Sequence, residues 1–298
     1  MTVQIAVAVG KFDALHVGHR ALIDAAASCG QPVLVRLGGM AQVLGWSERQ
    51  PIVAQHDRPR ILADWSRSLG QNVCEHVLDF AKLRALDANA FVALVREQLA
   101  ATGLVVGADF RCGTGRATGV DELAGICTRH GITLRIVPPA LIEGTPASSS
   151  RIRLALERGD TIAATACLGR PHRLMGTVQR GDGRGKVLGF PTANLGAGDN
   201  QAPAIGGYAA MALLPGKQAV PAAVNIGRLP TIAAGRALSI EAHLIGWSGD
   251  CYDAPIGLDL GVRLRDEQRF PGLDELKQQI ARDIDAVTAW HRLNLKST

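Results

Sequence analysis

The residues best suited to chemistry lie between Gly176 and Leu195, where glycines alternate with basic side chains and side-chain oxygens. Glycine lets the backbone approach a ligand closely and take positive φ values. The glycines are Gly176, Gly181, Gly183, Gly185 and Gly189, and the basic residues among them are Arg180, Arg184 and Lys186. Backbone N–H groups and cationic side chains together form a cradle for polyphosphate, so the stretch predicts a phosphate-binding loop.

Side-chain oxygens follow this loop directly. The segment consists of Phe190, Pro191, Thr192, Ala193 and Asn194. Thr192 offers a hydroxyl and Asn194 a carboxamide oxygen, and hard oxygen ligands suit a Mg²⁺ ion that bridges nucleotide phosphates. The pair Asp182-Gly183 is also a strong turn signal for a tight β-hairpin. Both interpretations stay open, because a hairpin can carry a phosphate loop.

A second group of functional side chains follows an apolar run, Val3 to Val9, that is typical of a buried parallel strand. The group comprises Gly10, Phe12, Asp13, His16, Gly18 and His19. A helix is expected next, and a strand, a glycine loop and a helix form the phosphate-binding unit of many α/β folds. Imidazoles at a helix N-terminus can donate hydrogen bonds to a polyphosphate. The alternatives are two surface histidines, or a zinc site for which no third ligand is suitably spaced.

Two later segments carry further candidates. Asp109 lies after the buried strand Leu104 to Val106, at the edge where parallel sheets place ligand contacts. Near residue 150 a helix is expected to begin, and its first turns hold Ser149, Ser150, Arg151 and Arg153. Serines there can simply cap the helix, but free N–H groups, hydroxyls and guanidiniums would also bind a triphosphate.

The two halves of the chain differ in periodicity. Up to Leu168, short apolar runs alternate with amphipathic helices, which indicates a parallel α/β domain. From Leu174 onward, short strands with Gly and Pro turns suggest a small antiparallel barrel, followed by a helix from Asp274 to about His291. We therefore expect a first domain over residues 1–168, a linker over 169–175 and a second domain over 176–298.

Composition limits the class of protein. The chain has 298 residues, 47% of them hydrophobic, which suits two domains with proper cores and excludes a disordered chain. Its apolar runs are too short to span a membrane, and its N-terminus lacks the basic region of a signal peptide. The net charge of +5 fits anionic small molecules as well as nucleic acid, and the basic residues form no tail. Six cysteines without a Cys-x-x-Cys pair indicate reduced thiols in a cytoplasm.

The run from Gly185 to Leu195 resembles the signature of riboflavin kinases, in which this loop holds MgATP. The resemblance implies that Thr192 and Asn194 contact the metal and the phosphates. Segments 225–231 and 240–244 resemble the Asn-x-Gly-x-x-Pro-Thr and Glu-x-His-Leu motifs of the same family. The resemblance to riboflavin kinases also implies that Asn225 belongs to the site, that Glu241 is the catalytic base and that Arg265 contacts the flavin. On strand alternation alone, Glu241 would suit a solvent-facing position.

Residues 10–19 resemble Gly-x-Phe-Asp-x-x-His-x-Gly-His of the adenylyltransferase module of bacterial FAD synthetases. Residues 148–153 resemble its Ser-Ser-Thr-x-Ile-Arg signature, with Ser150 for Thr, and residues 107–113 its Gly-x-Asp/Asn-Phe-x-Phe-Gly loop, with Cys112 for the second Phe. Residues 37–46 depart from the bacterial pattern, because the Phe-x-Pro-His-Pro segment is missing, and Ala14 replaces a Gly. Here the sequence looks like the plant plastid-type enzymes.

Together the resemblances imply a bifunctional enzyme with a Rossmann-like nucleotidylyltransferase domain and a six-stranded riboflavin kinase barrel. The second domain would phosphorylate riboflavin to FMN with ATP and Mg²⁺. The first would transfer AMP to FMN, giving FAD and pyrophosphate, with His16, His19 and Arg153 as its catalytic residues. The adenylyltransferase site would also include Gly10, Phe12, Asp13, Gly18, Asp109, Ser149, Ser150 and Arg151.

The expected partners are ATP, riboflavin and FMN, with no nucleic acid and no membrane, for a monomer or weak homo-oligomer. Two alternatives stay open. One is a riboflavin kinase whose adenylyltransferase domain is inactive or altered in substrate, motivated by the departure at residues 37–46. The other is a non-catalytic flavin or nucleotide sensor, which the presence of Glu241, Thr192 and both histidines argues against.

Overall fold

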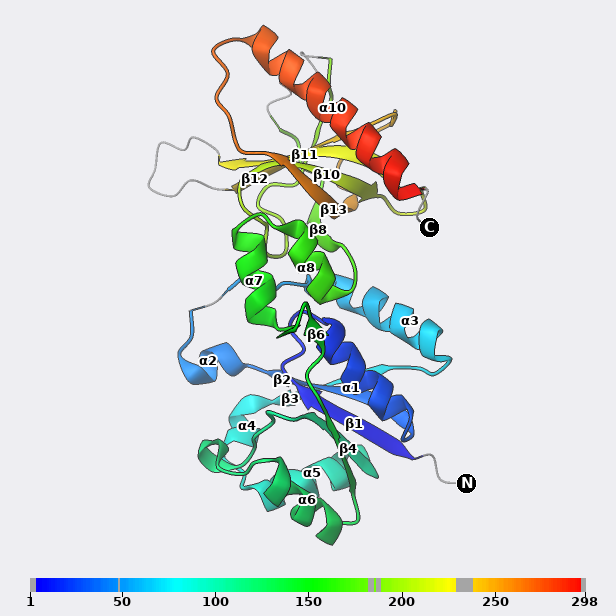
Figure 1. Cartoon of the computed structure of the whole chain (residues 1–298), viewed down its shortest axis with the longest axis vertical. Helices are drawn as coiled ribbons and strands as arrows, with labels where there is room; N and C mark the ends of the chain where they lie inside the picture. Colours follow the sequence, from blue (N-terminus) through cyan, green and yellow to red (C-terminus); the bar gives the residue numbers. More distant parts are fainter. Residues whose placement is uncertain (1–3, 48, 182–184, 186–188, 229–237, 296–298) are drawn as a thin grey trace. The chain divides into compact units, whose positions relative to one another are not determined.

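A computed structural model describes residues 4–47, 49–181, 185, 189–228 and 238–295 (Figure 1). Its contacts divide the chain into two compact units. The first comprises residues 1–49 and 55–148, and the second comprises residues 50–54 and 149–298. None of the described helices combines the length and the apolar character needed to cross a membrane.

The first unit is built on a five-stranded parallel sheet in the order β3-β2-β1-β4-β5. The strands are β1 Ile5–Gly10, β2 Gln31–Gly38, β3 Cys74–Asp79, β4 Gly103–Gly107 and β5 Thr133–Val137. The helices are α1 Val17–Ala27, α2 Met40–Leu44, α3 Arg58–Leu69, α4 Phe80–Arg84, α5 Ala88–Leu99 and α6 Val120–Arg129. The remaining elements are the 3₁₀ turns η1 Gln55–Asp57 and η2 Thr114–Arg116 and the hairpin of β6 Leu141–Ile142 and β7 Thr145–Pro146.

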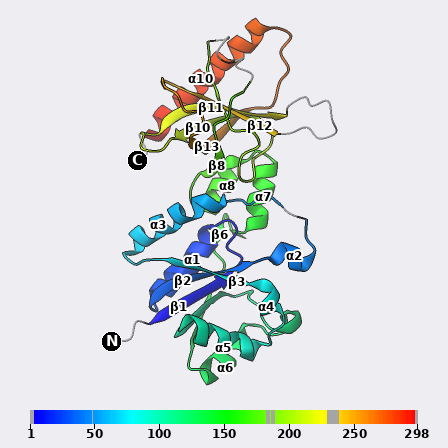
Figure 2. The same cartoon turned by 180° about the vertical axis from the view of Figure 1, so that it is seen from behind.

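Helices cover both faces of this sheet, as both cartoon views show (Figures 1 and 2). α1 and α3 lie on one face, and α5 and α6 lie on the other. The alternating residues of β1 divide between the two layers, and Val7 and Val9 join the core with Phe91 and Val95 of α5. Strand order changes direction at β1, so the loops after β1 and β4 leave the sheet at its switch point. In such sheets that carboxyl edge is where ligands bind.

The second unit holds a six-stranded antiparallel sheet in the order β8-β13-β10-β11-β12-β9. The strands are β8 His172–Thr177, β9 Ala193–Asn194, β10 Gly206–Leu213, β11 Val220–Arg228, β12 Leu238–Leu244 and β13 Pro255–Arg265. Just past β8, Gln179 forms a bridge with Asn194 of β9 and donates its backbone N–H to the Asn194 carbonyl at 2.7 Å. The bridge joins the two edges of the sheet, which is therefore curled into a barrel-like shape.

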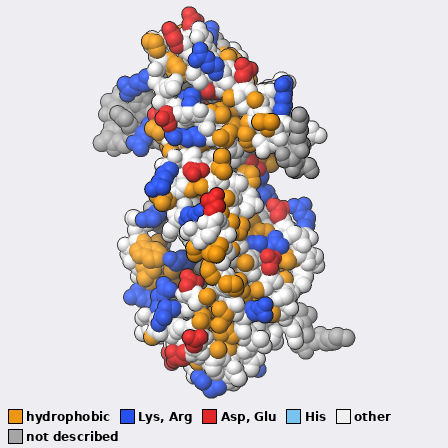
Figure 3. Space-filling view, viewed as in Figure 1, with side chains coloured by type: hydrophobic (Ala, Val, Ile, Leu, Met, Phe, Trp, Pro, Cys, Tyr) orange, Lys and Arg blue, Asp and Glu red, His pale blue; other side chains and the backbone are white. Residues whose placement is uncertain are grey.

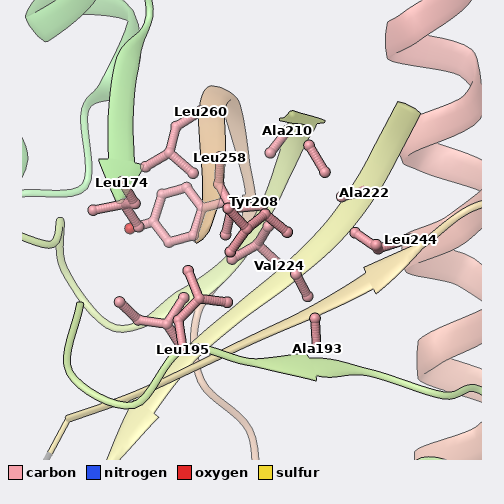
Figure 4. Packing of buried hydrophobic residues seen from close by; sticks show 14 of the residues in the cluster. Leu174, Ala193, Leu195, Tyr208, Ala210, Ala222, Val224, Leu244, Leu258 and Leu260 are labelled. Atoms are coloured by element: carbon pink, nitrogen blue, oxygen red, sulfur yellow. The ribbon is translucent and has the colours of Figure 1, made fainter. Parts of the chain in front are cut away.

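An apolar core fills the inside of this curled sheet (Figure 4). Tyr208, Leu174 and Leu258 are fully buried there. The outer face is covered by α10, Leu273–Leu295, which lies on β10 and β11. Two more helices belong to this unit, α7 Ser149–Glu157 and α8 Thr161–Leu168.

One short segment of the second unit comes from far upstream in the chain. Gln50–Ala54, which we call the strap, is held by two neighbouring amides. The buried Asn200 donates from Nδ2 to the carbonyls of Ile52 and Arg173, both at 2.9 Å. The backbone N–H of Gln201 donates to the Pro51 carbonyl at 2.8 Å. The strap is therefore fixed to the second unit by hydrogen bonds of its own backbone.

The predicted fold class is confirmed in both halves: a parallel sheet with helices, then a six-stranded antiparallel sheet with a C-terminal helix. The unit boundary differs from the expected one at residue 168. α7 and α8 group with the second unit because α8 packs on β8 and β13, and Thr161 donates to the Gly261 carbonyl at 2.5 Å. Residues 172–175, expected in a linker, lie in β8.

Candidate active sites

The two histidines of the first unit lie at the start of α1 and bond to each other's backbone. His16 is the N-cap residue, and its Nδ1 accepts from the N–H groups of Gly18 at 3.1 Å and His19 at 3.3 Å. In return, His19 Nδ1 accepts from the His16 N–H at 3.4 Å, and the rings stack with centroids 3.7 Å apart. Because each Nδ1 accepts a hydrogen bond, the proton of each neutral ring lies on Nε2. Each imidazole therefore has an Nε2–H able to donate to a phosphate oxygen.

Gly18 allows this arrangement. A Cβ on Gly18 would lie 3.0 Å from His16 Cε1 and 3.1 Å from its Nδ1, so a side chain would push against the capping ring. The loop before the helix is also unusual, since Phe12 and Leu15 have positive φ values of 47° and 48°. Both side chains are fully buried, and this burial holds a backbone conformation that costs energy for such residues.

A buried ion-pair cluster holds the same loop by a hydrogen bond to its backbone. Arg58, 3% exposed, donates from Nη1 to the Phe12 carbonyl at 2.8 Å and also pairs with Glu75. Arg36 reaches the same carboxylate with its Nε at 3.0 Å. Burial alone would raise the pKa of Glu75, but the two guanidiniums hold it below its ordinary value. The carboxylate therefore stays charged and fixes the Arg58 guanidinium against the Phe12 carbonyl.

The loop after β4 carries Asp109, which is exposed. Arg111 braces the loop by donating to the carbonyls of Arg116 and Ala117, both at 2.7 Å. Burial and the charge of Arg116 lower the pKa of Lys11 in the β1–α1 loop, so these two cations lie close enough to repel. Cys112 is buried, and burial raises the pKa of its thiol to about 11, which agrees with a packing role and not with a nucleophile.

The serine and arginine candidates lie on α7, in the second unit. Ser149 and Ser150 begin the helix, and Ile152 between the two arginines is buried. Arg153 donates from Nη1 to the Gln50 carbonyl at 2.9 Å and to Gln201 Oε1 at 2.6 Å. Its guanidinium is thus fixed against the strap. By chain contacts these residues group apart from His16 and His19, which belong to the first unit.

The kinase candidates of the second unit lie in register across its sheet. Asn194 on β9 is the direct partner of Glu241 on β12, and Glu241 is the direct partner of Asn225 on β11. The same line continues through Gly207 on β10 to Arg265 on β13. We call these five residues the cross-strand row. Since direct partners share a face of the sheet, the row gathers residues that are far apart in sequence.

The row lies on the face opposite the apolar core. Ala193, Ile240 and Ala242, which flank Asn194 and Glu241, are buried in that core, and Figure 4 shows Ala193 there. Alternation along a strand then turns the row residues to the outer face. Glu241 is partly exposed, and Ser239 donates to its Oε1 at 3.4 Å. Among the described residues, the partner of this carboxylate is a hydroxyl and not a cation, which suits a group that has to accept a proton.

Two glycines leave room beside the oxygen ligands. A Cβ on Gly181 would lie 2.9 Å from Asn194 Nδ2, and one on Gly185 would lie 3.1 Å from Thr192 Oγ1. Thr192 is exposed, and Asn194 Oδ1 accepts from the Gly196 N–H at 2.9 Å. Oxygen atoms from a hydroxyl, a carboxamide and the nearby Glu241 fit a Mg²⁺ ion.

Of the remaining residues predicted for the kinase site, some lie in the described part of the chain and some do not. A Cβ on Gly176 would lie 3.2 Å from Leu195 Cβ, so this glycine permits close packing of the barrel, and Gly189 has a φ of 87°. Lys186, like Gly183, Arg184 and the turn at Asp182, lies outside the described residues. Arg265 pairs with the buried Asp283 of α10, Nη2 to Oδ2 at 2.8 Å, which ties the end of the row to that helix.

His243 contacts the segment that precedes Thr192, and the sequence motif gave it no role. It lies two positions after Glu241 on β12, and its Nδ1 donates to the Pro191 carbonyl at 2.8 Å. Its ring also meets the Phe190 ring edge-on, with centroids 5.8 Å apart. Both contacts hold the segment that leads into Thr192. The signal in the sequence is the spacing, because residues two apart on a strand share a face.

Each half of the chain matches a known protein family. The FAD synthetase family matches residues 2–151, and the riboflavin kinase family matches residues 168–291. The bifunctional riboflavin kinase/FMN adenylyltransferase of Escherichia coli K12 is 34% identical over 280 residues, covering 92% of this chain and 89% of that protein. The corresponding protein of Pseudomonas fluorescens is 31% identical, covering 94% and 91%.

The plastid-type resemblance also has a counterpart. The chloroplastic FAD synthetase 2 of Arabidopsis thaliana is 36% identical over 237 residues, covering 74% of this chain and 64% of that protein's length. Among solved structures, a Streptococcus pneumoniae protein described as a macrolide-efflux protein aligns with a TM-score of 0.85 and 25% identity, over 97% of this chain and 96% of that one. With a FAD synthetase domain followed by a riboflavin kinase domain, this chain belongs to the family of bifunctional riboflavin kinase/FMN adenylyltransferases.

Proposed function

We propose that the second unit phosphorylates riboflavin to FMN and that the first unit adenylylates FMN to FAD. The observation that carries the proposal is the cross-strand row, which brings Asn194, Glu241 and Asn225 together on one face of the sheet. The paired histidines at the start of α1 support the second activity. Six free cysteines are in keeping with a cytoplasmic location, which we also propose.

In the kinase step, Glu241 accepts the proton of the ribityl 5′-hydroxyl. That hydroxyl is a poor nucleophile at neutral pH, so a positioned base speeds its attack on the γ-phosphorus of ATP. The new oxygen–phosphorus bond forms as the bond to the bridging oxygen breaks, and ADP leaves. Thr192 and Asn194 would hold Mg²⁺, which when bound neutralises charge on the phosphates. The glycines at 181 and 185 let the backbone lie close to these ligands.

In the adenylyl transfer step, a phosphate oxygen of FMN attacks the α-phosphorus of ATP and pyrophosphate leaves. The nucleophile is already an anion, so no base is required, and positioning with charge stabilisation suffices. His16 and His19 donate from Nε2 to phosphate oxygens. Lys11 and Arg116 add positive charge beside the same loop. Ser149, Ser150, Arg151 and Arg153 are proposed to bind the departing pyrophosphate.

The test separates the products formed from riboflavin and MgATP by the wild type, by Glu241→Gln and by His19→Ala. We expect the wild type to form FAD, His19→Ala to accumulate FMN, and Glu241→Gln to lose about 10²- to 10⁴-fold in FMN formation. Glu241→Gln should still convert added FMN to FAD. Glu275→Gln on α10 is the matched control. FMN as the only wild-type product would refute the proposed role of the first unit.

A further inference from the structure

The segment after β2 forms an apolar surface next to the adenylyltransferase loop. α2 consists of Met40, Ala41, Gln42, Val43 and Leu44, and none of these is buried. Trp46 follows and is 52% exposed. Figure 3 shows hydrophobic side chains gathered over the position of α2, with Lys and Arg side chains beside them. This is the segment in which the chain departs from the bacterial sequence pattern.

The backbone that carries the exposed indole is held in a defined position. Gly45 ends α2 with a φ of 66°, and the backbone N–H of Trp46 donates to the Ala41 carbonyl at 2.9 Å. Arg84 of α4 holds α2 by donating from Nη1 to the Val43 carbonyl at 3.1 Å. A large aromatic ring that is exposed on a fixed backbone binds a planar ligand at a small entropic cost.

A cation joins this surface to the reacting groups. Lys11 Nζ lies 4.6 Å from the centroid of the Trp46 ring. Lys11 is in the same loop as His16, and its lowered pKa agrees with a position near Arg116. A ligand that stacks on Trp46 and extends toward His16 would therefore meet an apolar surface first and positive charge second.

FMN has this distribution of chemistry. Its isoalloxazine ring is planar and apolar at the dimethylbenzene edge, and its phosphate is an anion at the far end of the ribityl chain. Adenine has no apolar edge of this kind. Moreover, Trp46 follows β2, whereas the loop with Asp109 follows β4, on the other side of β1. In-line transfer requires the attacking phosphate and the leaving pyrophosphate to lie on opposite sides of the α-phosphorus.

We propose that Trp46 stacks on the isoalloxazine ring of FMN and that Lys11 attracts its phosphate end. The inference rests on the proposed adenylyltransferase function. Trp46 is thus a specificity-determining residue for the flavin and takes no part in the bond changes.

The experiment measures the conversion of FMN to FAD by the full chain with Trp46→Ala and Trp46→Phe. Trp46→Ala should raise KM for FMN about tenfold while KM for ATP stays within twofold, and Trp46→Phe should recover most of the loss. Tyr252→Ala is the matched control, since Tyr252 is 48% exposed and has Arg180 5.1 Å from its ring. An unchanged KM for FMN, or a rise for ATP alone, would overturn the proposal.

Equilibrium titration separates this inference from the proposed function. Stacking on indole quenches flavin fluorescence, so FMN should be quenched by the wild type and by Tyr252→Ala but less by Trp46→Ala. If the wild type makes no FAD, the proposed function fails, and the titration alone still decides whether the indole stacks. Equal quenching by all three proteins would refute the stacking.

Discussion

Gly18 determines where the His16 ring can lie. The capping bonds require the ring to lie against the first turn of α1, and a Cβ at position 18 would come within 3.0 Å of its Cε1. The glycine between the two histidines is therefore needed for its lack of a side chain more than for any unusual backbone angle.

We predict that Gly18→Ala lowers the rate of FAD formation from FMN by at least about tenfold, because the displaced ring no longer donates at the same place. FMN formation from riboflavin should be unchanged. Gly125→Ala on α6 is the control, since its Cβ would meet only Arg129 at 3.8 Å. Steady-state kinetics of both reactions check this, and equal adenylyl transfer by the two variants would contradict it.

At the scale of single residues, the sequence predicts which residues lie at a site but not the geometry of their side chains. It places His16 and His19 at a helix start, yet the ring proton on Nε2 follows only from the capping bonds. Likewise the Arg265 motif gives no sign of Asp283, which lies on another element 18 residues away. Such partners depend on tertiary packing, which no local pattern encodes.

Among the elements, periodicity predicts strands and helices wherever one face is buried. The buried strand expected over Leu104 to Val106 is β4, Gly103–Gly107, and the helix expected from Asp274 to about His291 is α10, Leu273–Leu295. β3 is not predicted by its sequence, because only Leu78 of Cys74–Asp79 is buried at this sheet edge. Register is also beyond prediction: alternation puts Glu241 on one face of its strand, but only pairing shows that Asn194 and Asn225 are its neighbours.

β8 carries a buried histidine that links strand stability to pH. Burial lowers the pKa of His172 from 6.5 to about 4, and its Nε2 donates to the Gln201 carbonyl at 2.7 Å. The unfolded chain binds this proton near pH 6.5, whereas the folded chain does not until about pH 4. The contribution of His172 is therefore fully present above pH 6.5 and is lost as pH falls through this window.

We predict that the free energy of unfolding of the second unit falls between pH 6.5 and about 4, with a slope from this residue of at most about 1.4 kcal/mol per pH unit. His172→Asn keeps an N–H donor but cannot titrate, so its profile should be flatter. Urea unfolding at several pH values measures both slopes. Identical slopes would show that another group is responsible.

In the molecule as a whole, the strap makes the second unit discontinuous in sequence. The chain passes between the units at residues 49–50, 54–55 and 148–149. Sequence reasoning predicts one uninterrupted boundary, because the periodicity changes only near residue 170. Five residues are too few to shift composition or periodicity, so their membership of the second unit is visible only in contacts.

We predict that Asn200→Ala destabilises the full chain by about 2 to 4 kcal/mol. Asn200 is 1% exposed, and its loss leaves the carbonyls of Ile52 and Arg173 and the N–H of Met175 without their bonds to it. Chemical denaturation measures the change, with the exposed Asn89→Ala as control. A loss below about 1 kcal/mol would mean that water replaces the amide.

The strap also imposes an order of events during synthesis on the ribosome. Asn200 and Ile52 are 148 positions apart, so half of the chain is made between the strap and the amide that holds it. A nascent chain that has released the first unit still carries a pentapeptide, four of whose residues are apolar, before Asn200 has been made. Translation speed over residues 55–200 therefore sets how long Ile52 and Val53 are open to chaperones or misdirected contacts, since contacts this distant form late.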